Sequence, residues 1–318
     1  MKKLMYLPHE LIIQILLRLP VKSLIRFKCV CKLWLTLVSD PHFAISHFQL
    51  NSATPNPRIL IISTPASLVR SIDLEASLHD DSASAELNLN FIHPQSSVEI
   101  KGSCNGFIYD FASMCLWNPS NGVHRQIPSS PYNSNCFYYL DGFGANTWKE
   151  MEGIYLPYMN AGDNSRVGSL VNGAIHWVAF NSDTSMDVIV AFDLAERKLV
   201  EMFLPDDFNI DSNFYELWVF GEFLSLWVRG EDAVEIWVMK EYKVQSSWTM
   251  TLVLPMDDYF SPICCTIKGD IIGTGSTGLV KYDDKGQLLE HRSYGVVPHG
   301  SQVAMYVESL LSLPVDSV

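Results

Sequence analysis

The apolar positions of the first forty residues follow the period of an α-helix. Within residues 8–19 they fall at Leu11, Ile12, Ile15, Leu16 and Leu19, which together form one continuous face of a helix. Pro8 suits the first position of this helix, where its missing N–H costs nothing, and Pro20 ends it. The same reasoning predicts a second helix over residues 21–30 and a third over residues 31–38, before Asp40 and Pro41.

The pattern changes after residue 50, where the helical period disappears. A stretch rich in Pro, Asn and Ser predicts a linker, and residues 59–63 predict a first strand. Residues 78–89 are acidic and rich in Ser, which predicts a loop. From Gly102 onward, short β-branched and aromatic runs alternate with Gly, Asn and Pro, which indicates an all-β region.

A unit consisting of a turn glycine, a hydrophobic strand and an aromatic strand occurs four times in this region. Its glycines are Gly106, Gly173, Gly221 and Gly269, so the last two intervals are 48 residues each and the first is 67. A period of about 40–50 residues with several strands is typical of propeller-like arrays. The first interval falls 29 residues short of two periods. We therefore predict that a unit within residues 128–168 has lost a pair of strands.

The predicted helices carry more apolar surface than three short helices can bury among themselves. About 40 residues are also too few to form a stable domain without a metal, a disulfide or a partner. The surplus predicts a docking surface for another protein. The alternative is that the helices pack on the rest of the chain, and their periodicity alone leaves both interpretations open.

Charge separates the two regions. The 318-residue chain has a formal net charge of −13, which argues against nucleic acid or an anionic membrane as a partner. Residues 1–50 nevertheless carry +5, which leaves −18 for the remainder and indicates two units with different partners. The seven cysteines are odd in number and irregularly spaced, so we expect reduced thiols and a location in the cytoplasm or nucleus. No apolar run is long enough to predict a transmembrane helix.

Four segments of the N-terminal region resemble, in order, a complete plant-type F-box: residues 7–11, 15–24, 26–34 and 39–43. The resemblance implies binding to the Skp-type adaptor of SCF ubiquitin ligases and, through it, to cullin and RING subunits. The residues implied in adaptor binding are Leu7, Pro8, Leu11, Ile12, Ile15, Leu16, Leu19, Pro20, Val21, Leu24, Phe27, Val30, Cys31 and Trp34. For Phe27, Cys31 and Trp34 we expect at least half of the role to be internal packing.

The β-rich region resembles a second plant family, the F-box-associated interaction domain of S-locus-like and F-box/kelch proteins. The matching segments are residues 102–106, 116–120, 142–144, 146–149, 168–177 and 189–194. The resemblance implies a domain that holds a protein target. Members of the family usually place two further strands between the third and fourth of these segments, whereas here only Ala145 separates them.

Motifs that would indicate catalysis, a metal or a cofactor are weak. Residues 273–278 fit G-x-G-x-x-G, but another strand-like run follows where a dinucleotide fold needs a helix, so we predict a hairpin. Cys29 and Cys31, and the adjacent Cys264 and Cys265, lack the spacing of a zinc site. His176 is interpreted as a structural residue. We therefore expect no catalytic residue, metal or cofactor.

The fold class predicted is α+β by segment. A three-helix F-box at residues 1–45 and a linker at 46–58 precede a mainly-β, propeller-like F-box-associated domain at 59–318 that lacks one strand pair. The expected function is that of a non-catalytic substrate-recognition subunit of an SCF ubiquitin ligase. Its target-binding residues are unknown, and acidic loops favour a basic target: Asp206, Asp207, Asp211, Glu231, Asp232, Asp257 and Asp258. The alternatives are a β-propeller that binds a ligand or carbohydrate, and a decoy that binds the adaptor without productive target capture.

Overall fold

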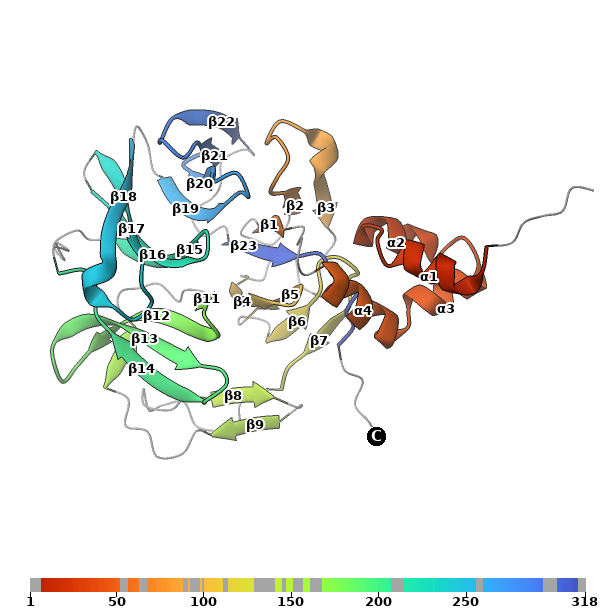
Figure 1. Cartoon of the computed structure of the whole chain (residues 1–318), viewed down its shortest axis with the longest axis horizontal. Coiled ribbons are helices and arrows are strands. Elements are labelled where there is room, and N and C mark those ends of the chain that lie inside the picture. The colour runs from red at the N-terminus through yellow and green to blue at the C-terminus, as the bar shows by residue number, and fades with distance from the viewer. Residues whose placement is uncertain are drawn as a thin grey trace, which may run out of the picture.

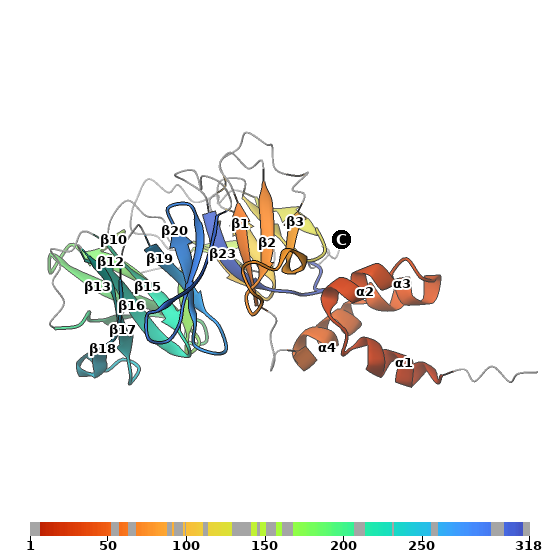
Figure 2. The ribbon, with the colours of Figure 1, turned by 90° about the horizontal axis from the view of Figure 1, so that it is seen from above.

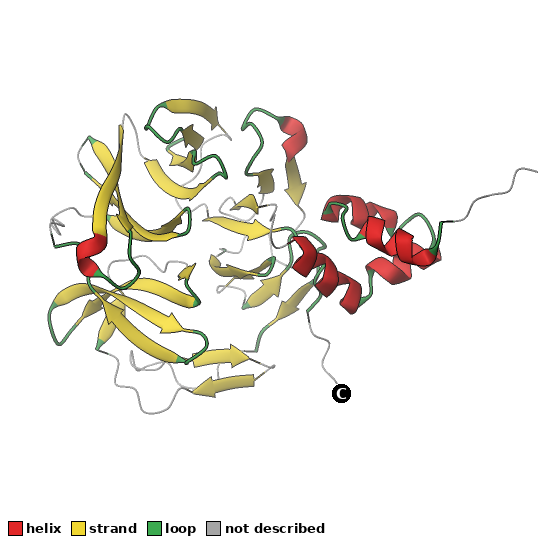
Figure 3. Ribbon diagram, viewed as in Figure 1, coloured by secondary structure: helices red, strands yellow, loops and turns green. Residues whose placement is uncertain are grey.

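The structure is a computed structural model with two parts, four N-terminal helices and a propeller-like ring of antiparallel sheets (Figure 1). Figure 3 shows the long helices gathered on one side of the strands, and Figure 2 shows the same separation from above. The residues described are 7–51, 57–62, 68–87, 91, 98, 100–110, 114–128, 141–144, 147–150, 157–160, 168–206, 214–230, 232–255, 260–293 and 302–313. No helix within these ranges is long and apolar enough to cross a membrane.

Three of the four helices are those predicted: α1 (His9–Leu16), α2 (Val21–Phe27) and α3 (Lys32–Val38). The fourth, α4 (Pro41–Asn51), was not predicted, and it extends into residues predicted to be a linker. The Asp40 side chain accepts a hydrogen bond from the Phe43 N–H at 3.0 Å, and Pro41 occupies the first helical position. This Asp-Pro pair is therefore the start signal of a helix as well as the end of the preceding one.

Five antiparallel sheets form the blades of the ring. The first blade consists of β23 (Gln302–Val307), β1 (Pro57–Ile62), β2 (Val69–Asp73) and β3 (Ser84–Leu87). The second consists of β4 (Ile100–Cys104), β5 (Phe107–Asp110), β6 (Cys115–Trp117) and β7 (His124–Gln126). The third consists of β10 (Tyr158–Asn160), β11 (Ser169–Val171), β12 (Ala174–Asn181), β13 (Met186–Asp193) and β14 (Lys198–Met202).

The fourth blade consists of β15 (Tyr215–Phe220), β16 (Phe223–Arg229), β17 (Ala233–Met239) and β18 (Trp248–Pro255). The fifth consists of β19 (Phe260–Cys265), β20 (Ile271–Gly275), β21 (Gly278–Tyr282) and β22 (Leu288–Ser293). The hairpin of β20 and β21 contains the G-x-G-x-x-G match and pairs antiparallel, as predicted. Two short 3₁₀-helices, η1 (Asp81–Ala83) and η2 (Gln245–Ser247), lie in connections.

The four repeated glycines occupy equivalent turns in four blades. They lie between β4 and β5, β11 and β12, β15 and β16, and β19 and β20. Their φ angles are +83°, +75°, +64° and +91°, values that L side chains rarely adopt. The repeat read from the sequence therefore corresponds to these four blades. Each of them needs a residue with a positive φ in the turn of its first hairpin.

The ring is closed by its C-terminal strand. β23 pairs antiparallel with β1 along its full length, with Leu60 opposite Ala304. The first and last strands of the ring thus share the first blade, which has no turn glycine because two distant segments meet there.

The shortened region contains one isolated hairpin. β8 (Asp141–Gly144) and β9 (Thr147–Glu150) pair only with each other in the part of the chain described, with Gly144 opposite Thr147. Figure 1 shows this hairpin between the second and third blades. A two-stranded sheet beside four- and five-stranded blades agrees with the predicted loss of a strand pair.

One predicted loop was wrong in part. Within residues 78–89 the chain forms η1 and then β3, which pairs with β2 at the outer edge of the first blade. The strand is half-buried and polar, so it shows little of the alternation by which strands are recognised.

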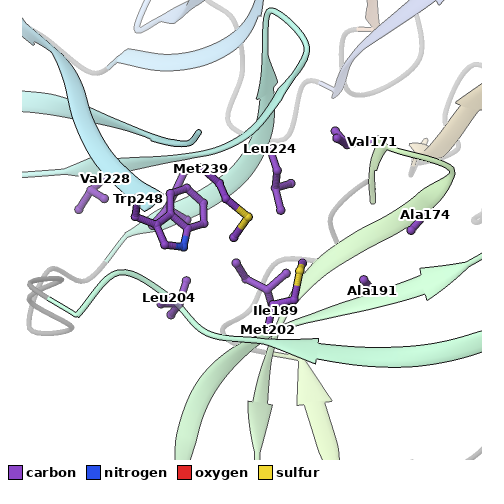
Figure 4. Close-up of a cluster of buried hydrophobic side chains, with 11 residues drawn as sticks. Val171, Ala174, Ile189, Ala191, Met202, Leu204, Leu224, Val228, Met239 and Trp248 are labelled. Carbon is purple, nitrogen blue, oxygen red and sulfur yellow. The ribbon is translucent and has the colours of Figure 1, made fainter. Parts of the chain in front are cut away.

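Buried side chains join neighbouring blades. Between the third and fourth blades, Ile189 and Met202 face Leu224, Met239 and Trp248 (Figure 4). Similar clusters join the fourth blade to the fifth, the fifth to the first, and the first to the second. In the described residues the core is therefore divided among the junctions between blades, and blades that share a cluster stabilise each other.

Candidate functional site

An exposed apolar stripe lies on and before α1. Leu7, Leu11 and Ile15 are 58%, 49% and 50% exposed. They are four residues apart, so the two within the helix lie one turn above the other on the same side. Leu16 points into the helical core and is 2% exposed. We call Leu7, Leu11 and Ile15 the α1 stripe.

Three of the predicted adaptor contacts lie inside the helical core instead. Leu16, Val21 and Leu24 are buried together with Leu17, Val38, Phe43 and Ala44. An apolar helical face indicates that its side chains will be buried. The local pattern does not show whether they are buried by the rest of this chain or by another protein. In this conformation these three residues stabilise the helices.

The remaining predicted residues divide by exposure. Ile12, Leu19, Phe27 and Trp34 are partly buried against the helical core, and the Phe27 and Trp34 rings lie 5.0 Å apart. The exposed ones are Pro8, Pro20, Val30 and Cys31. Internal packing is thus confirmed for Phe27 and Trp34 but was wrong for Cys31.

Two exposed residues of α3 were missed, Leu33 and Leu35, which are 52% and 47% exposed. Their apolar character was visible in the sequence. Spacing groups Leu35 with Trp34 and Val38 on one side of the helix, but it does not show which apolar residues of a short helix stay exposed.

The C-terminal end of α1 is held by α4. The buried His47 donates its Nε2–H to the Leu19 carbonyl at 2.9 Å, and the Asn51 amide donates to the Leu17 carbonyl at 3.1 Å. Carbonyl groups at a helix C-terminus lack partners within the helix. α4 therefore fixes the helix that carries the α1 stripe.

The helical core also includes residues from the far end of the chain. Leu310 is 6% exposed and packs in this core, and Leu311 packs partly against it. Packing of the helices on the rest of the chain is therefore confirmed for part of the apolar surplus, and a docking surface stays a prediction. Part of it binds the C-terminal segment, and part of it, including the α1 stripe, stays exposed.

The helices carry a positive charge among their exposed apolar residues. Arg18, Lys22, Arg26 and Lys32 are exposed, against one exposed acid, Glu10. This charge complements an acidic partner.

His176 and Cys264, two candidates for chemistry, are buried and packed. In the described residues no three His, Cys, Asp or Glu side chains come together as a metal site would require. His176 is buried, with Nδ1 2.9 Å from the Ser169 carbonyl and Nε2 2.8 Å from the Tyr242 hydroxyl. Burial raises the pKa of the Cys264 thiol well above its ordinary value, which disfavours the reactive thiolate.

The acidic loops proposed for target binding are only partly visible. Asp206 accepts a hydrogen bond from the Gln245 amide at 2.6 Å, and Asp232 is exposed. Asp207, Asp211, Glu231, Asp257 and Asp258 lie outside the described residues. A target-binding surface therefore stays a prediction.

Comparison with known proteins identifies the helical part. Residues 4–46 match the F-box domain family. The chain is 26% identical over 355 residues to F-box/kelch-repeat protein At3g23880 of Arabidopsis thaliana, covering 96% of this chain and 95% of that one. It is 26% identical over 292 residues to F-box protein At5g49610 of the same plant, covering 76% of this chain and 77% of that one.

A shorter match is closer in sequence. Putative F-box protein At3g47150 of Arabidopsis thaliana is 52% identical over 56 residues, 18% of this chain and 16% of that one. The chain thus carries an N-terminal F-box domain followed by a β-rich region, and its relatives are Arabidopsis F-box and F-box/kelch-repeat proteins. The resemblance of the N-terminal region to an F-box is confirmed, and the matches to F-box and F-box/kelch-repeat relatives extend over the β-rich region.

Proposed function

We propose that this chain is the non-catalytic substrate-recognition subunit of an SCF-type ubiquitin ligase, and that the α1 stripe is the centre of its contact with a Skp-type adaptor. The observation that carries the proposal is the exposure of Leu7, Leu11 and Ile15 on the first helix of a matched F-box domain. Large aliphatic side chains on a soluble protein are seldom left in a row without a partner.

The energetics of the stripe fit a stable contact. Fully burying one Leu or Ile side chain contributes about 1.5–3 kcal/mol. Three such side chains form a centre of the kind that dominates protein–protein binding, and the surrounding Lys and Arg residues act mainly on association rate and specificity. The buried Leu16, Val21 and Leu24 support this surface from behind.

The β-ring holds the target in this proposal. The reaction joins a target lysine to ubiquitin: the lysine amine attacks the thioester carbonyl of ubiquitin, an amide bond forms, and the cysteine thiol of a separate conjugating enzyme leaves. This chain contributes effective concentration, because it binds the ligase at one end and the target at the other. The acidic charge outside residues 1–50 favours a basic target.

Charge introduced into the α1 stripe tests the proposal. We expect Leu11→Asp and Ile15→Asp each to weaken adaptor binding by at least about 30-fold, the equivalent of a 2 kcal/mol hot spot. Both residues are half exposed, so the fold should be retained. Affinity is measured with the purified full chain and a Skp-type adaptor by titration calorimetry, with size-exclusion chromatography for the complex.

The matched control is Leu50→Asp on α4. Leu50 is 48% exposed, close to the 49% of Leu11, but it lies outside the predicted adaptor face. It should leave the affinity within about twofold, a change of about 0.4 kcal/mol. Unchanged binding by both α1 variants would refute the assigned surface, and failure of the natural chain to bind would refute the ligase proposal itself.

A further inference from the structure

Asn118 is a buried residue whose side chain reaches the opposite end of the chain. It follows β6 and is 0% exposed. Its Nδ2 donates to the Ser309 carbonyl at 3.1 Å, the Ser309 hydroxyl at 3.0 Å and the Leu311 carbonyl at 3.0 Å. Its Oδ1 accepts from the Ser120 N–H at 2.8 Å, which fixes the turn between β6 and β7. One amide therefore holds both its own turn and a segment 191 residues away.

Neighbouring groups hold the same segment. The Asn121 amide donates to the Leu311 carbonyl at 3.0 Å, and the Ser309 N–H donates to the Ser120 hydroxyl at 3.1 Å. A Cβ on Gly106 would lie 2.5 Å from the Ser309 hydroxyl, so a side chain there would displace the segment. The second blade is thus shaped to receive residues 308–311, which we call the C-terminal strap.

The strap is also tied to the first blade. It begins directly after β23, and Glu308 lies 3.6 Å from the buried guanidinium group of Arg58 on β1. The strap therefore leaves the ring from a fixed point and runs against the second blade.

The other side of the strap contacts the F-box. Leu310 is 6% exposed within the helical core, with Leu311 partly buried beside it. Figures 1 and 2 both show the chain after β23 passing from the ring to the helices. The strap is thus bound to the ring by hydrogen bonds and to the helices by apolar contacts. Two units that share buried contacts of both kinds move together, whereas a linker alone would let them rotate.

We propose that Asn118 is a positioning residue: by fixing the C-terminal strap between the second blade and the F-box, it sets the orientation of the adaptor-binding helices relative to the β-ring. The consequence for ubiquitin transfer rests on the proposed function. A fixed orientation would hold a bound lysine within reach of the conjugating enzyme, and small misplacements of the lysine would reduce the rate of ubiquitin transfer strongly. The role of the strap in fixing the two units can be tested with this chain alone.

Asn118→Asp separates the strap from the turn. The variant keeps the oxygen that accepts from Ser120 but loses the N–H donors, and it places a carboxylate against the carbonyl oxygens of Ser309 and Leu311. Asn181→Asp is the matched control. Asn181 is also buried, its Oδ1 accepts from the Asp183 and Thr184 N–H groups in a turn, and its amide donates to Glu201. Its side chain does not contact the strap.

A third variant, Leu311→Ala, loosens the strap from the F-box side without altering the β6–β7 turn.

The measurement is the distance between the two units in the full chain. Spin labels on non-natural amino acids at Lys32 of α3 and Lys198 of β14, both exposed, report it by double electron–electron resonance. We expect one narrow distance distribution for the natural chain and Asn181→Asp, and broad distributions for Asn118→Asp and Leu311→Ala. A narrow, unshifted distribution in both strap variants would overturn the proposal. If Asn118→Asp fails to fold, the distance distribution of Leu311→Ala decides alone whether the strap fixes the two units.

A second readout concerns transfer. In a ligase reconstituted with adaptor, cullin, RING and conjugating enzyme, mass spectrometry identifies which lysines of the chain itself receive ubiquitin. We expect a restricted set in the natural chain and Asn181→Asp, and a wider set in the strap variants, with adaptor affinity within about twofold, or about 0.4 kcal/mol. An identical set in all variants would count against a positioning role. If no variant binds the adaptor, the proposed function fails, and the distance measurement still decides whether the strap fixes the two units.

Discussion

His176 uses both ring nitrogens: Nδ1 contacts Ser169 within the third blade, and Nε2 contacts Tyr242, which follows β17 of the fourth blade. Because Nδ1 faces the Ser169 carbonyl, it carries the proton, and Nε2 accepts from the Tyr242 hydroxyl. Burial of the ring lowers the pKa of His176 below its ordinary value of 6.5, and the nearby charge of Lys243 acts in the same direction. The neutral imidazole is therefore part of the folded structure.

A pH dependence follows from this. Because the pKa is lower in the folded chain, the unfolded chain binds the proton first as pH falls, so the stabilisation is complete above pH 6.5 and is lost below it. We expect the free energy of unfolding to fall by up to about 1.4 kcal/mol per pH unit in that range. Urea unfolding between about pH 7.5 and pH 5.5 measures it. His176→Gln should lack this slope and the exposed His42→Gln should keep it; equal slopes in all three chains would contradict the assignment.

The site residues differ in how far the sequence could predict them. Spacing placed Leu11 and Ile15 on an apolar face, and both are exposed. The same spacing could not separate them from Leu16, because a face this wide has one edge against neighbouring helices and another in solvent. Asn118 lay in a motif that was recognised, but its partners are 191 and 193 residues distant, and no local pattern encodes that contact.

Among the elements, α4 depends on a single capping group. Asp40 accepts the Phe43 N–H, and loss of such a cap costs about 1 kcal/mol. We expect Asp40→Ala to destabilise the helices by this amount and to speed hydrogen exchange in α4 and at the end of α1, which His47 and Asn51 of α4 hold. Asp40→Asn retains an acceptor and should behave as the natural chain. Unchanged exchange in Asp40→Ala would show that the cap contributes nothing.

Elements with a strong period were predicted and weakly patterned ones were not. β12 and β13 contain long hydrophobic runs because they are covered by neighbouring blades. β3 is an outer strand with half-buried positions, and the pair of Arg70 and Glu86, 3.1 Å apart, helps to hold it. Polar pairs across an edge strand leave no hydrophobic signal, so the sequence indicated a loop.

In the whole molecule, the ring could be predicted from repetition and its closure could not. Gly106, Gly173, Gly221 and Gly269 mark four blades because each first hairpin needs a positive φ. The first blade has no such mark. Its innermost strand, β23, comes from the other end of the chain, and Tyr306 on it hydrogen-bonds Ser71 at 2.8 Å across 235 residues. A closure of this kind is visible only when both ends are seen together.

Closure by β23 can be tested by shortening the chain. A chain ending at residue 301 lacks β23, which leaves β1 without a partner and exposes Leu60 and Ile62, both fully buried in the closed ring. Losing a buried aromatic such as Tyr306 costs about 3–5 kcal/mol by itself, so the melting temperature should fall by about 10 °C or more. Hydrogen exchange in β1 and β2 should accelerate, and the free edge should promote aggregation. A chain ending at residue 313 retains β23 and the strap, so it should behave as the natural chain. If the chain ending at residue 301 kept full protection in β1, the ring would be held by contacts between blades, and β23 would be an addition to it.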